Sequence, residues 1–517
     1  MTTSLPGPGV ARVHGAVLTG IHAEIIEVQA TVAVGAPGFA IIGVPGDGTR
    51  EMRDRVRAAV LNSGFAWPSG GITVSLGSPC LFRRGCGLDL PVAVAVLAAA
   101  STVPAGPATT GRVFAAELGL DGRLRPVRGI VPVLMAAAAG HGGRVTAVIA
   151  PQNTPEAAML PGATIVPAES LGQVAAGLRG EPLAAGPFRP APPGRVSGPA
   201  QDEYPGLTGL GVSPVVRQLL EVSAAAGHHL CLTGPRGADV PALAAGLVTL
   251  LPDLTGKEAG EVTAIYSAAG LLGSRRARIM RPPVRVPDHR ATIAAMTGGG
   301  TGLQPGEAAL AHGGVLCLDD APEFERAVLR TLAQPLRDGE IVIARGGSIA
   351  RFPARFILVA GMRPWPCGAG SGCTCIPLQT RRYRDRVTGT LGAWIPLRAA
   401  VDRPGLTHLP VGQSGQDTDA LSAARVAEAR DRMGHRLSGT PWRRNGDIPR
   451  HELARTYPPA DDGQAVIDHA IDLGLIGNLG ATHITAVAWT LTDLAGRSCP
   501  GAAECAQALA FRAGAAR

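Results

Sequence analysis

Lysine is almost absent from this sequence, because Lys257 is the only one among 517 residues. Two kinds of lysine chemistry are thereby excluded elsewhere in the chain: a phosphate-binding lysine after a glycine-rich turn, and a serine–lysine catalytic pair. Gly256 and Lys257 follow Leu254 and Thr255 rather than a glycine loop after a buried strand. We therefore expect Lys257 in a surface loop.

Aromatic and charged residues are also scarce, at 3% and 17% of the chain, whereas hydrophobic residues make up 46%. This balance favours packed globular domains over disorder, and the length predicts two or three of them. The longest apolar stretch, around residues 90–100, is too short to cross a bilayer, and the N-terminus lacks the pattern of a secretory signal. We expect a cytoplasmic protein with no membrane partner.

The nine cysteines are an odd number and lie scattered along the chain, which argues against a disulfide framework. Three of them cluster in the stretch PWPCGAGSGCTC: Cys367, Cys373 and Cys375. Three sulfurs at this spacing can share a tetrahedral metal such as Zn²⁺, but a closed structural site requires four ligands. No fourth ligand is evident nearby, so an incomplete or vestigial zinc site is expected.

The formal net charge of +8 and the isoelectric point near 9.3 are compatible with a polyanionic partner such as DNA. The abundance of Ala, Gly, Pro and Arg has a second explanation, a GC-rich coding bias that raises arginine content without any ligand. Both interpretations of the charge stay open.

Composition along the chain predicts three structured segments. Residues 1–180 alternate helix-like and strand-like stretches, with a helix expected at 51–61, a strand at 72–76, a two-residue hairpin turn at Asp121 and Gly122, and a helix N-cap at Thr154. Linkers rich in Pro and Gly are expected at 181–206 and 402–418. They separate a central domain, 207–401, from a helical domain, 419–517.

The central segment contains a degenerate phosphate-binding loop. An apolar run, residues 230–233, leads into Gly234, Pro235, Arg236 and Gly237 and then into an Ala-rich helix, so backbone N–H groups at a helix start would face a phosphate. The full motif is GxxxxGK[ST], in which lysine reaches the outer phosphates and the hydroxyl binds Mg²⁺. Here Asp239, Val240 and Pro241 occupy the last three positions. The sequence therefore predicts that binding of ATP and Mg²⁺ is weak or lost.

A second nucleotide-site motif lies at residues 314–320. The run GVLCL ends in Asp319 and Asp320, as in a Walker B strand that delivers carboxylates at its end. Asp319 would hold Mg²⁺, directly or through water, and Asp320 stands where glutamate polarises the attacking water. Since aspartate is one methylene shorter, Asp320 is expected to be inactive. Two solvated acids at a strand end are the alternative.

Collinear blocks along nearly the whole chain resemble the magnesium-chelatase-like AAA+ ATPases of the YifB/ComM family. They include GVPGDGTREMRDRVRAAVLNSGFAWP, VPDHRATIAAMTGGG, GLQPGEAALAHGGVLCLDDAPEFERAVLRTLAQPLRDGEIVIAR, FPARFILVAGM and VAWTLTDLAG. The resemblance implies an α/β multidomain fold: an N-terminal α+β domain of the ChlI type, similar to the Lon protease domain, a doubly wound AAA+ domain and a C-terminal helical domain. It also implies a hexameric ring that hydrolyses ATP and, in the family's best-known member, a DNA branch-migration motor.

Departures from the family pattern concentrate at catalytic positions. Arg363 stands in place of a sensor Asn, Ala393 and Trp394 replace an Asp-Arg pair, and Leu479 lies near the position of a sensor Arg. Proteolysis is not expected either, because no serine lies near the nucleophile position in residues 84–89, and Cys86 has no evident base.

We therefore expect a pseudo-ATPase that acts through DNA, through a homo-oligomer or through an intact family member. A working DNA-processing ATPase that uses Arg in place of Lys, and a structural scaffold, are the alternatives.

Overall fold

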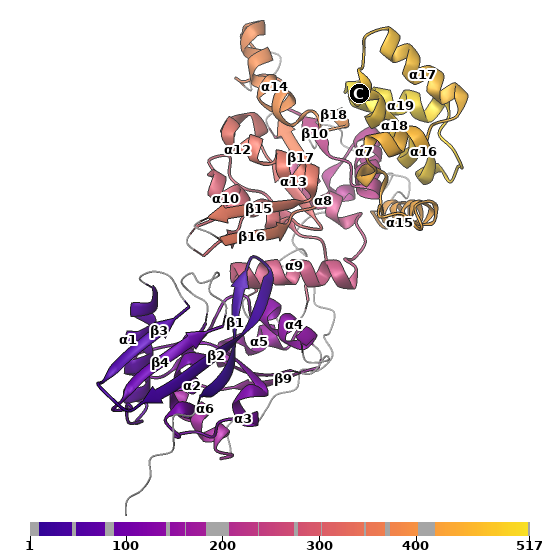
Figure 1. The fold of residues 1–517 in the computed structure, drawn as a ribbon. Coiled ribbons are helices and arrows are strands. Elements are labelled where there is room, and N and C mark those ends of the chain that lie inside the picture. Colours follow the sequence, from indigo (N-terminus) through magenta and orange to yellow (C-terminus); the bar gives the residue numbers. More distant parts are fainter. Residues whose placement is uncertain are drawn as a thin grey trace, which may run out of the picture.

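The computed structural model describes residues 10–43, 48–77, 87–140, 145–160, 162–181, 206–235, 237–272, 278–300, 302–345, 348–367, 373–401 and 419–514. Nearly all of the two expected linkers lies outside these residues, as do Arg236 and Cys86. The chain is a mixed α/β protein in which an N-terminal sheet, a central sheet and a group of C-terminal helices follow one another (Figure 1).

The N-terminal sheet has seven strands in the order β3-β4-β2-β1-β5-β8-β9. β1 pairs antiparallel with β2, and β2 with β4, while the other neighbours run parallel, so this sheet is mixed. The apolar helix α2 is buried along almost its whole length and packs on β1 and β2. The strands are β1 (Ala11–Thr19), β2 (His22–Ala33), β3 (Gly38–Ile42), β4 (Gly71–Leu76), β5 (Arg112–Ala115), β8 (Val145–Ile149) and β9 (Ala163–Pro167). The helices are α1 (Gly48–Asn62), α2 (Asp89–Ala99), α3 (Pro107–Thr110), α4 (Ile130–Gly140), η1 (Pro151–Asn153), α5 (Thr154–Ala157) and α6 (Leu171–Leu178).

The expected hairpin forms between β6 (Glu117–Leu118) and β7 (Leu124–Arg125), but its turn differs from the prediction. The loop spans residues 119–123, and Gly122 alone has a positive φ, of 78°. Asp121 instead accepts a hydrogen bond from the backbone N–H of Arg123 at 3.1 Å. This side-chain turn holds the chain without a left-handed residue at 121, so the predicted two-residue turn was wrong.

The N-cap expected at Thr154 was also wrong. Thr154 is the first residue of α5, directly after the 3₁₀ turn η1, and its hydroxyl is buried with no hydrogen-bond partner among the described residues. The preceding 3₁₀ turn places residue 154 in helical conformation, whereas an N-cap needs extended backbone.

The central sheet has five parallel strands in the order β11-β14-β17-β10-β18. Successive residues of β10 face two different cores: Leu230 and Leu232 pack in one apolar cluster, and Cys231 in another. Both faces are therefore covered, as expected for a parallel sheet. The strands are β10 (Leu230–Thr233), β11 (Val284–Arg285), β14 (Val315–Leu318), β17 (Ile357–Met362) and β18 (Leu397–Ala400).

The remaining elements of the central part surround this sheet. The helices are η3 (Leu207–Leu210), α7 (Pro214–Ala226), α8 (Val240–Thr249), α9 (Gly256–Ala269), α10 (Ile293–Thr297), α11 (Glu307–Leu310), η4 (Ala321–Glu323), α12 (Arg326–Thr331), α13 (Ala333–Asp338) and α14 (Pro377–Leu391). Two small hairpins join β12 (Gly298–Gly299) to β13 (Gln304–Pro305) and β15 (Glu340–Arg345) to β16 (Ser348–Pro353).

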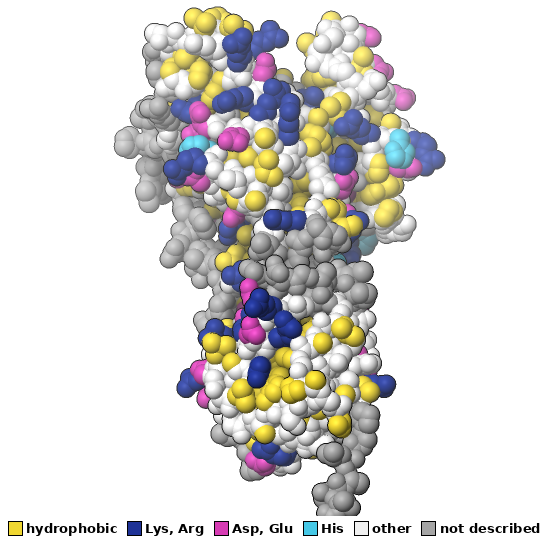
Figure 2. All heavy atoms as spheres, turned by 60° about the vertical axis from the view of Figure 1, so that its left-hand side comes forward, with side chains coloured by type: hydrophobic (Ala, Val, Ile, Leu, Met, Phe, Trp, Pro, Cys, Tyr) yellow, Lys and Arg dark blue, Asp and Glu magenta, His cyan; other side chains and the backbone are white. Residues whose placement is uncertain are grey.

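The C-terminal part is helical and packs beside the central sheet, so the upper half of the molecule is divided into two lobes (Figures 1 and 2). Its central helix α18 contacts α7, α15 and α19. The elements are α15 (Asp419–Arg436), η6 (Asn445–Asp447), α16 (Arg450–Thr456), α17 (Asp461–Asp472), α18 (Asn478–Ala495) and α19 (Ala502–Ala513). No helix in the described ranges has the length and apolarity that crossing a membrane requires.

Helix α9 joins the N-terminal sheet to the central one. It lies between the two in Figure 1, and apolar residues of α4 and α9 belong to one continuous buried cluster. Ser267 of α9 donates a hydrogen bond to the Glu156 carboxylate at 3.0 Å and accepts one from the backbone N–H of Val131 at 3.2 Å. The two parts thus share both a core and buried polar contacts.

Candidate functional site

The candidate site lies at the carboxyl edge of the central sheet. Parallel strands end at the same edge, so the segments that follow β10, β14 and β17 lie close together. These segments contain the loop from Gly234, the acids Asp319 and Asp320, and Arg363. Of the residues predicted for the site, Gly234, Pro235, Gly237, Asp319 and Asp320 lie at this edge, and Arg236 lies outside the described residues.

The loop after β10 leads into α8, whose N-cap is Asp239. The Asp239 carboxylate accepts a hydrogen bond from the backbone N–H of Ala242 at 3.0 Å. A helix N-terminus attracts anions because its first N–H groups lack intrahelical partners and carry the positive end of the helix dipole. Here the protein's own carboxylate occupies that place.

The next two positions, Val240 and Pro241, also lack the groups that bind a phosphate and its Mg²⁺. Val240 is buried, and a Cβ built on Gly361 of β17 would lie 3.0 Å from its Cγ1, so Val240 packs closely against that strand. Pro241, in the first turn of α8, has no N–H group to donate. The first turn of α8 therefore offers no lysine, no hydroxyl and one backbone donor fewer than an ordinary helix start.

Two acids, Asp319 and Asp320, follow β14, and the negative charge of Asp239 acts on Asp319. Asp319 accepts a hydrogen bond from the backbone N–H of Asp320 at 3.1 Å, and Asp320 has a positive φ of 48°. Partial burial, followed by the charges of Asp320 and Asp239, raises the pKa of Asp319 above its usual value. The charges of Asp320 and Asp239 thus add to the cost of ionising Asp319, at the edge where a Mg-nucleotide would contribute its own phosphates.

Arg363 partly neutralises these acids. Its guanidinium donates to Asp320 at 2.9 Å and to Glu323 at 2.6 Å, and its side chain is only 15% exposed. Asp320 is therefore held by an arginine rather than left free to orient a water molecule. The sequence marks Arg363 as a departure from the family pattern, but its bridge to Glu323 was not predicted. The signal for it is the short spacing of the two acids, because Asp320 directly precedes η4 and Glu323 ends it.

The three clustered cysteines do come together. Their sulfur atoms lie within 4.8 Å of one another, and the Sγ atoms of Cys367 and Cys373 are 3.4 Å apart. Sulfurs around a tetrahedral Zn²⁺ with bonds of about 2.3 Å would lie roughly 4 Å apart, so the three thiols fit three corners of such a site. Within the described residues no fourth His, Cys, Asp or Glu joins them.

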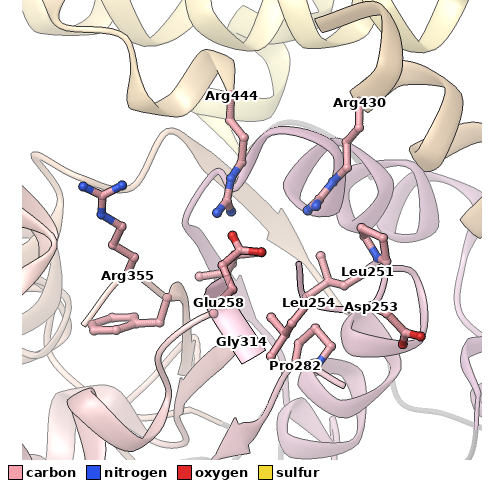
Figure 3. A pocket seen from close by; sticks show the side chains of 13 residues that line it. Leu251, Asp253, Leu254, Glu258, Pro282, Gly314, Arg355, Arg430 and Arg444 are labelled. Carbon is pink, nitrogen blue, oxygen red and sulfur yellow. The ribbon is translucent and has the colours of Figure 1, made fainter. Parts of the chain in front are cut away.

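A small pocket of about 30 Å³ lies at the opposite, amino edge of the sheet, where β14 and β17 begin (Figure 3). Arg430 and Arg444 point into it from the C-terminal part, towards Glu258. Arg430 also donates to the carbonyl of Ala224 at 2.6 Å, and burial, together with Arg444, lowers its pKa to about 9. Because Glu258 faces these arginines, we interpret the pocket as a contact between the central part and the C-terminal helices, separate from the candidate site.

Comparisons with known proteins agree with this architecture. The family descriptions that match are "Subunit ChlI of Mg-chelatase" over residues 28–153, "Magnesium chelatase, subunit ChlI" over 211–408, and the ChlI C-terminal region over 416–512. An uncharacterised protein of Mycobacterium tuberculosis is 37% identical over 98% of this chain and 99% of its own length. YifB of Escherichia coli is 36% identical over 81% of each chain. The competence protein ComM of Haemophilus influenzae is 32% identical over 98% of this chain and 97% of its own.

Proposed function

Because the chain belongs to the YifB/ComM family of magnesium-chelatase-like proteins, we propose that it is a pseudo-ATPase of that family. We assign the central part to the AAA+ fold and the N-terminal part to the Lon-protease-like fold. In this proposal the protein acts in the cytoplasm through association with DNA or with an intact family member, as one subunit type of a ring.

The observation that carries the proposal is the Asp239 carboxylate at the start of α8. It satisfies the Ala242 N–H and opposes any second anion there, while Val240 and Pro241 supply neither the charge nor the hydroxyl that Mg-ATP needs. These residues do not fit the phosphates of ATP. The ion pair of Arg363 with Asp320 further ties up the acid that would polarise water.

The test restores the loop with Asp239→Gly, Val240→Lys and Pro241→Thr in one variant. Calorimetric titration with Mg-ATP should detect a binding event in the restored protein that the wild type lacks. A variant with Asp239→Gly alone is the matched control, since it removes the competing carboxylate but adds neither lysine nor hydroxyl, and we expect it to bind at most weakly. If the wild type binds ATP as tightly as the restored form, the loop is not defective.

Hydrolysis gives a second measurement. The wild type should turn over ATP no faster than the Asp319→Ala, Asp320→Ala double variant, with or without DNA. Robust turnover that this double variant abolishes would favour the alternative of a working ATP-dependent DNA-processing enzyme.

Association with DNA is supported by the basic charge of the exposed helix α14. Its residues Arg381, Arg382, Arg384 and Arg386 are all exposed, against one acid on the same helix, Asp385. Figure 2 shows Lys and Arg side chains gathered in the upper part of one face of the molecule. Binding through phosphates alone should weaken with salt, by a slope of about −0.9 in log K against log salt for each neutralised phosphate. Anisotropy with duplex DNA at several salt concentrations tests this, and no binding at low salt would leave the scaffold alternative.

A further inference from the structure

A cavity of about 590 Å³ lies beside the candidate site, between the loop after β17, the first turns of α14 and the strand β18. Its volume is within the range of roughly 300–1,000 Å³ that is usual for small-molecule sites. The residues that line it are Trp365, Cys373, Cys375, Pro377, Thr380, Arg381, Arg384, Asp385, Thr388 and Arg398.

The charges in this cavity do not balance. Three arginines line it, Arg381, Arg384 and Arg398, and the one acid, Asp385, lies 3.8 Å from Arg381. Arg384 donates one hydrogen bond to the carbonyl of Pro364 at 3.3 Å, which leaves its charge without a carboxylate partner among the described residues.

Arg398 is the least satisfied of the three. Its Nε is buried and has no hydrogen-bond partner within the described part of the chain. Burial, followed by the charge of Arg398, lowers the pKa of Arg512, so a second cation rather than an acid lies near Arg398. A buried donor without an acceptor is costly and uncommon in native proteins, so an acceptor from outside the protein would remove a defect.

We propose that this cavity binds a phosphate ester, with Arg384 and Arg398 donating to the phosphate oxygens. Guanidinium groups form paired, charge-assisted hydrogen bonds with phosphate, and a cavity with two unneutralised arginines suits a dianion. Trp365 adds an aromatic side chain to the lining, on which a nucleobase can stack. The ligand is therefore a nucleotide phosphate, either free or at the end of a strand, and it binds without the loop at Gly234.

The test is calorimetric titration of the full chain in reducing buffer at fixed ionic strength, with AMP, with inorganic phosphate and with a 5′-phosphorylated oligothymidylate. Arg398→Gln and Arg384→Gln should each weaken AMP binding at least about tenfold, the loss expected for one charge-assisted hydrogen bond. Arg330→Gln is the matched control, because this exposed arginine of α12 removes the same charge but lies outside both the cavity lining and the basic helix α14, and it should change the affinity less than about twofold.

The probes also distinguish a free nucleotide from the phosphorylated end of a strand. Tighter binding of AMP than of the oligonucleotide assigns the cavity to a free nucleotide, and the reverse assigns it to a strand end. AMP affinity that Arg398→Gln weakens and Asp319→Asn leaves unchanged separates this cavity from the acids at the end of β14. The proposal is overturned if no phosphate probe binds, or if Arg330→Gln weakens binding as much as Arg398→Gln does. Because thermal unfolding of each variant is measured alongside, a loss of fold is not mistaken for a loss of binding.

Discussion

Asp239 has two effects of opposite sign on the stability of the candidate site. Its carboxylate caps α8 by accepting from Ala242, and its negative charge complements the helix dipole. The same charge contributes to raising the pKa of Asp319, which shows that the two acids repel each other. An amide at position 239 would keep the cap and remove the repulsion.

Two substitutions at this position separate the effects. Asp239→Ala should lower the free energy of unfolding by about 1 kcal/mol, the usual cost of losing an N-cap. Asp239→Asn should leave it unchanged or raise it slightly, because asparagine caps equally well. Urea denaturation monitored by circular dichroism measures both. Equal losses for the two variants would mean that the charge, rather than the cap, is what stabilises this turn.

At the scale of single residues, the sequence predicted which groups the site lacks better than which contacts the site contains. The missing lysine and hydroxyl are evident from the positions of Val240 and Pro241 in a known spacing. The bridge from Arg363 to Asp320 and Glu323 is not evident from the sequence. It depends on β17 lying beside β14, and this neighbourhood follows from the order of the strands in the sheet.

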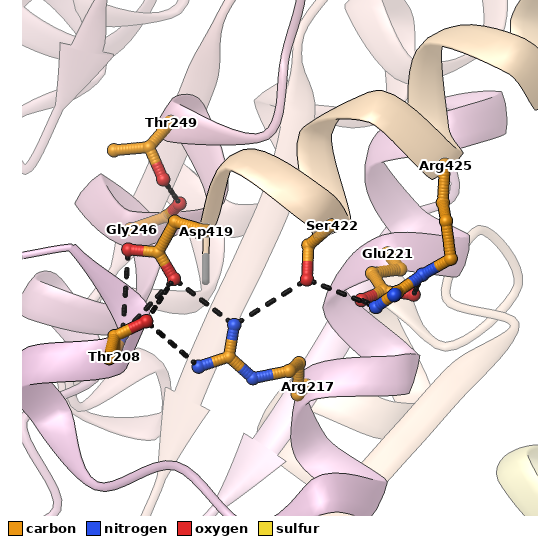
Figure 4. Close-up of polar contacts among 8 residues, drawn as sticks. All are labelled: Thr208, Arg217, Glu221, Gly246, Thr249, Asp419, Ser422 and Arg425. Carbon is orange, nitrogen blue, oxygen red and sulfur yellow. Dashed lines mark hydrogen bonds and ion pairs between the residues drawn. The ribbon is translucent and has the colours of Figure 1, made fainter. Parts of the chain in front are cut away.

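Among the elements, α15 is held against α7 by a network of hydrogen bonds and ion pairs (Figure 4). Arg217 donates to Asp419 at 3.0 Å, and Asp419 also accepts from the backbone N–H of Thr208 at 3.1 Å. A second pair, Arg425 and Glu221, lies one turn further along α7, and the Arg425 guanidinium donates to the Glu221 carboxylate at 2.6 Å. These contacts join the start of the C-terminal helices to the central part.

Arg217→Met should therefore destabilise the protein more than the loss of an ordinary surface charge. The Arg217 side chain is 12% exposed, and its removal leaves Asp419 without its cation, so we expect a loss of about 2 kcal/mol. Glu428→Ala, which breaks an exposed pair with Arg432 on the same helix α15, should cost less than about 0.5 kcal/mol. Chemical denaturation of both variants checks this difference, and similar losses would contradict it.

Element types were more predictable than the ends of the elements. The strand expected at 72–76 and the helix at 51–61 both form, because each shows a clear apolar period. The turn at Asp121 and the cap at Thr154 do not form as predicted, because a side-chain hydrogen bond and a preceding 3₁₀ turn decide the local backbone there. Neither contact can be predicted from the conformational preferences of the local residues.

At the scale of the whole molecule, a buried acid lies where the N-terminal part meets α9. Burial raises the pKa of Glu156 to about 7, although the hydrogen bond from Ser267 acts in the opposite direction. The folded protein thus holds this proton more tightly than the unfolded chain, in which a glutamate titrates near 4.5. The protonated acid contributes stability that is fully present below about pH 4.5 and is lost as the pH rises through 7.

Glu156→Gln should remove this dependence. Above pH 7 the variant should exceed the wild type by on the order of 3 kcal/mol, since one unit of pKa shift corresponds to about 1.4 kcal/mol and glutamine stays neutral. Below pH 4.5 the two proteins should differ little. Thermal unfolding from pH 4 to 8 measures the difference, with the exposed Glu169→Gln as control. A constant difference between wild type and Glu156→Gln at all pH values would show that Glu156 does not titrate in this range.

The carboxylate that caps α8 also bears on how the protein responds to the energy state of the cell. A protein that binds ATP is stabilised by mass action, by about 2.7 kcal/mol at a concentration one hundred times Kd. In the pseudo-ATPase that we propose, the Asp239 carboxylate already occupies the start of α8, so a fall in the concentration of ATP removes no ligand from this helix. The stability of α8 would then stay constant, whereas a protein that binds ATP at this helix start would lose ligand and stability.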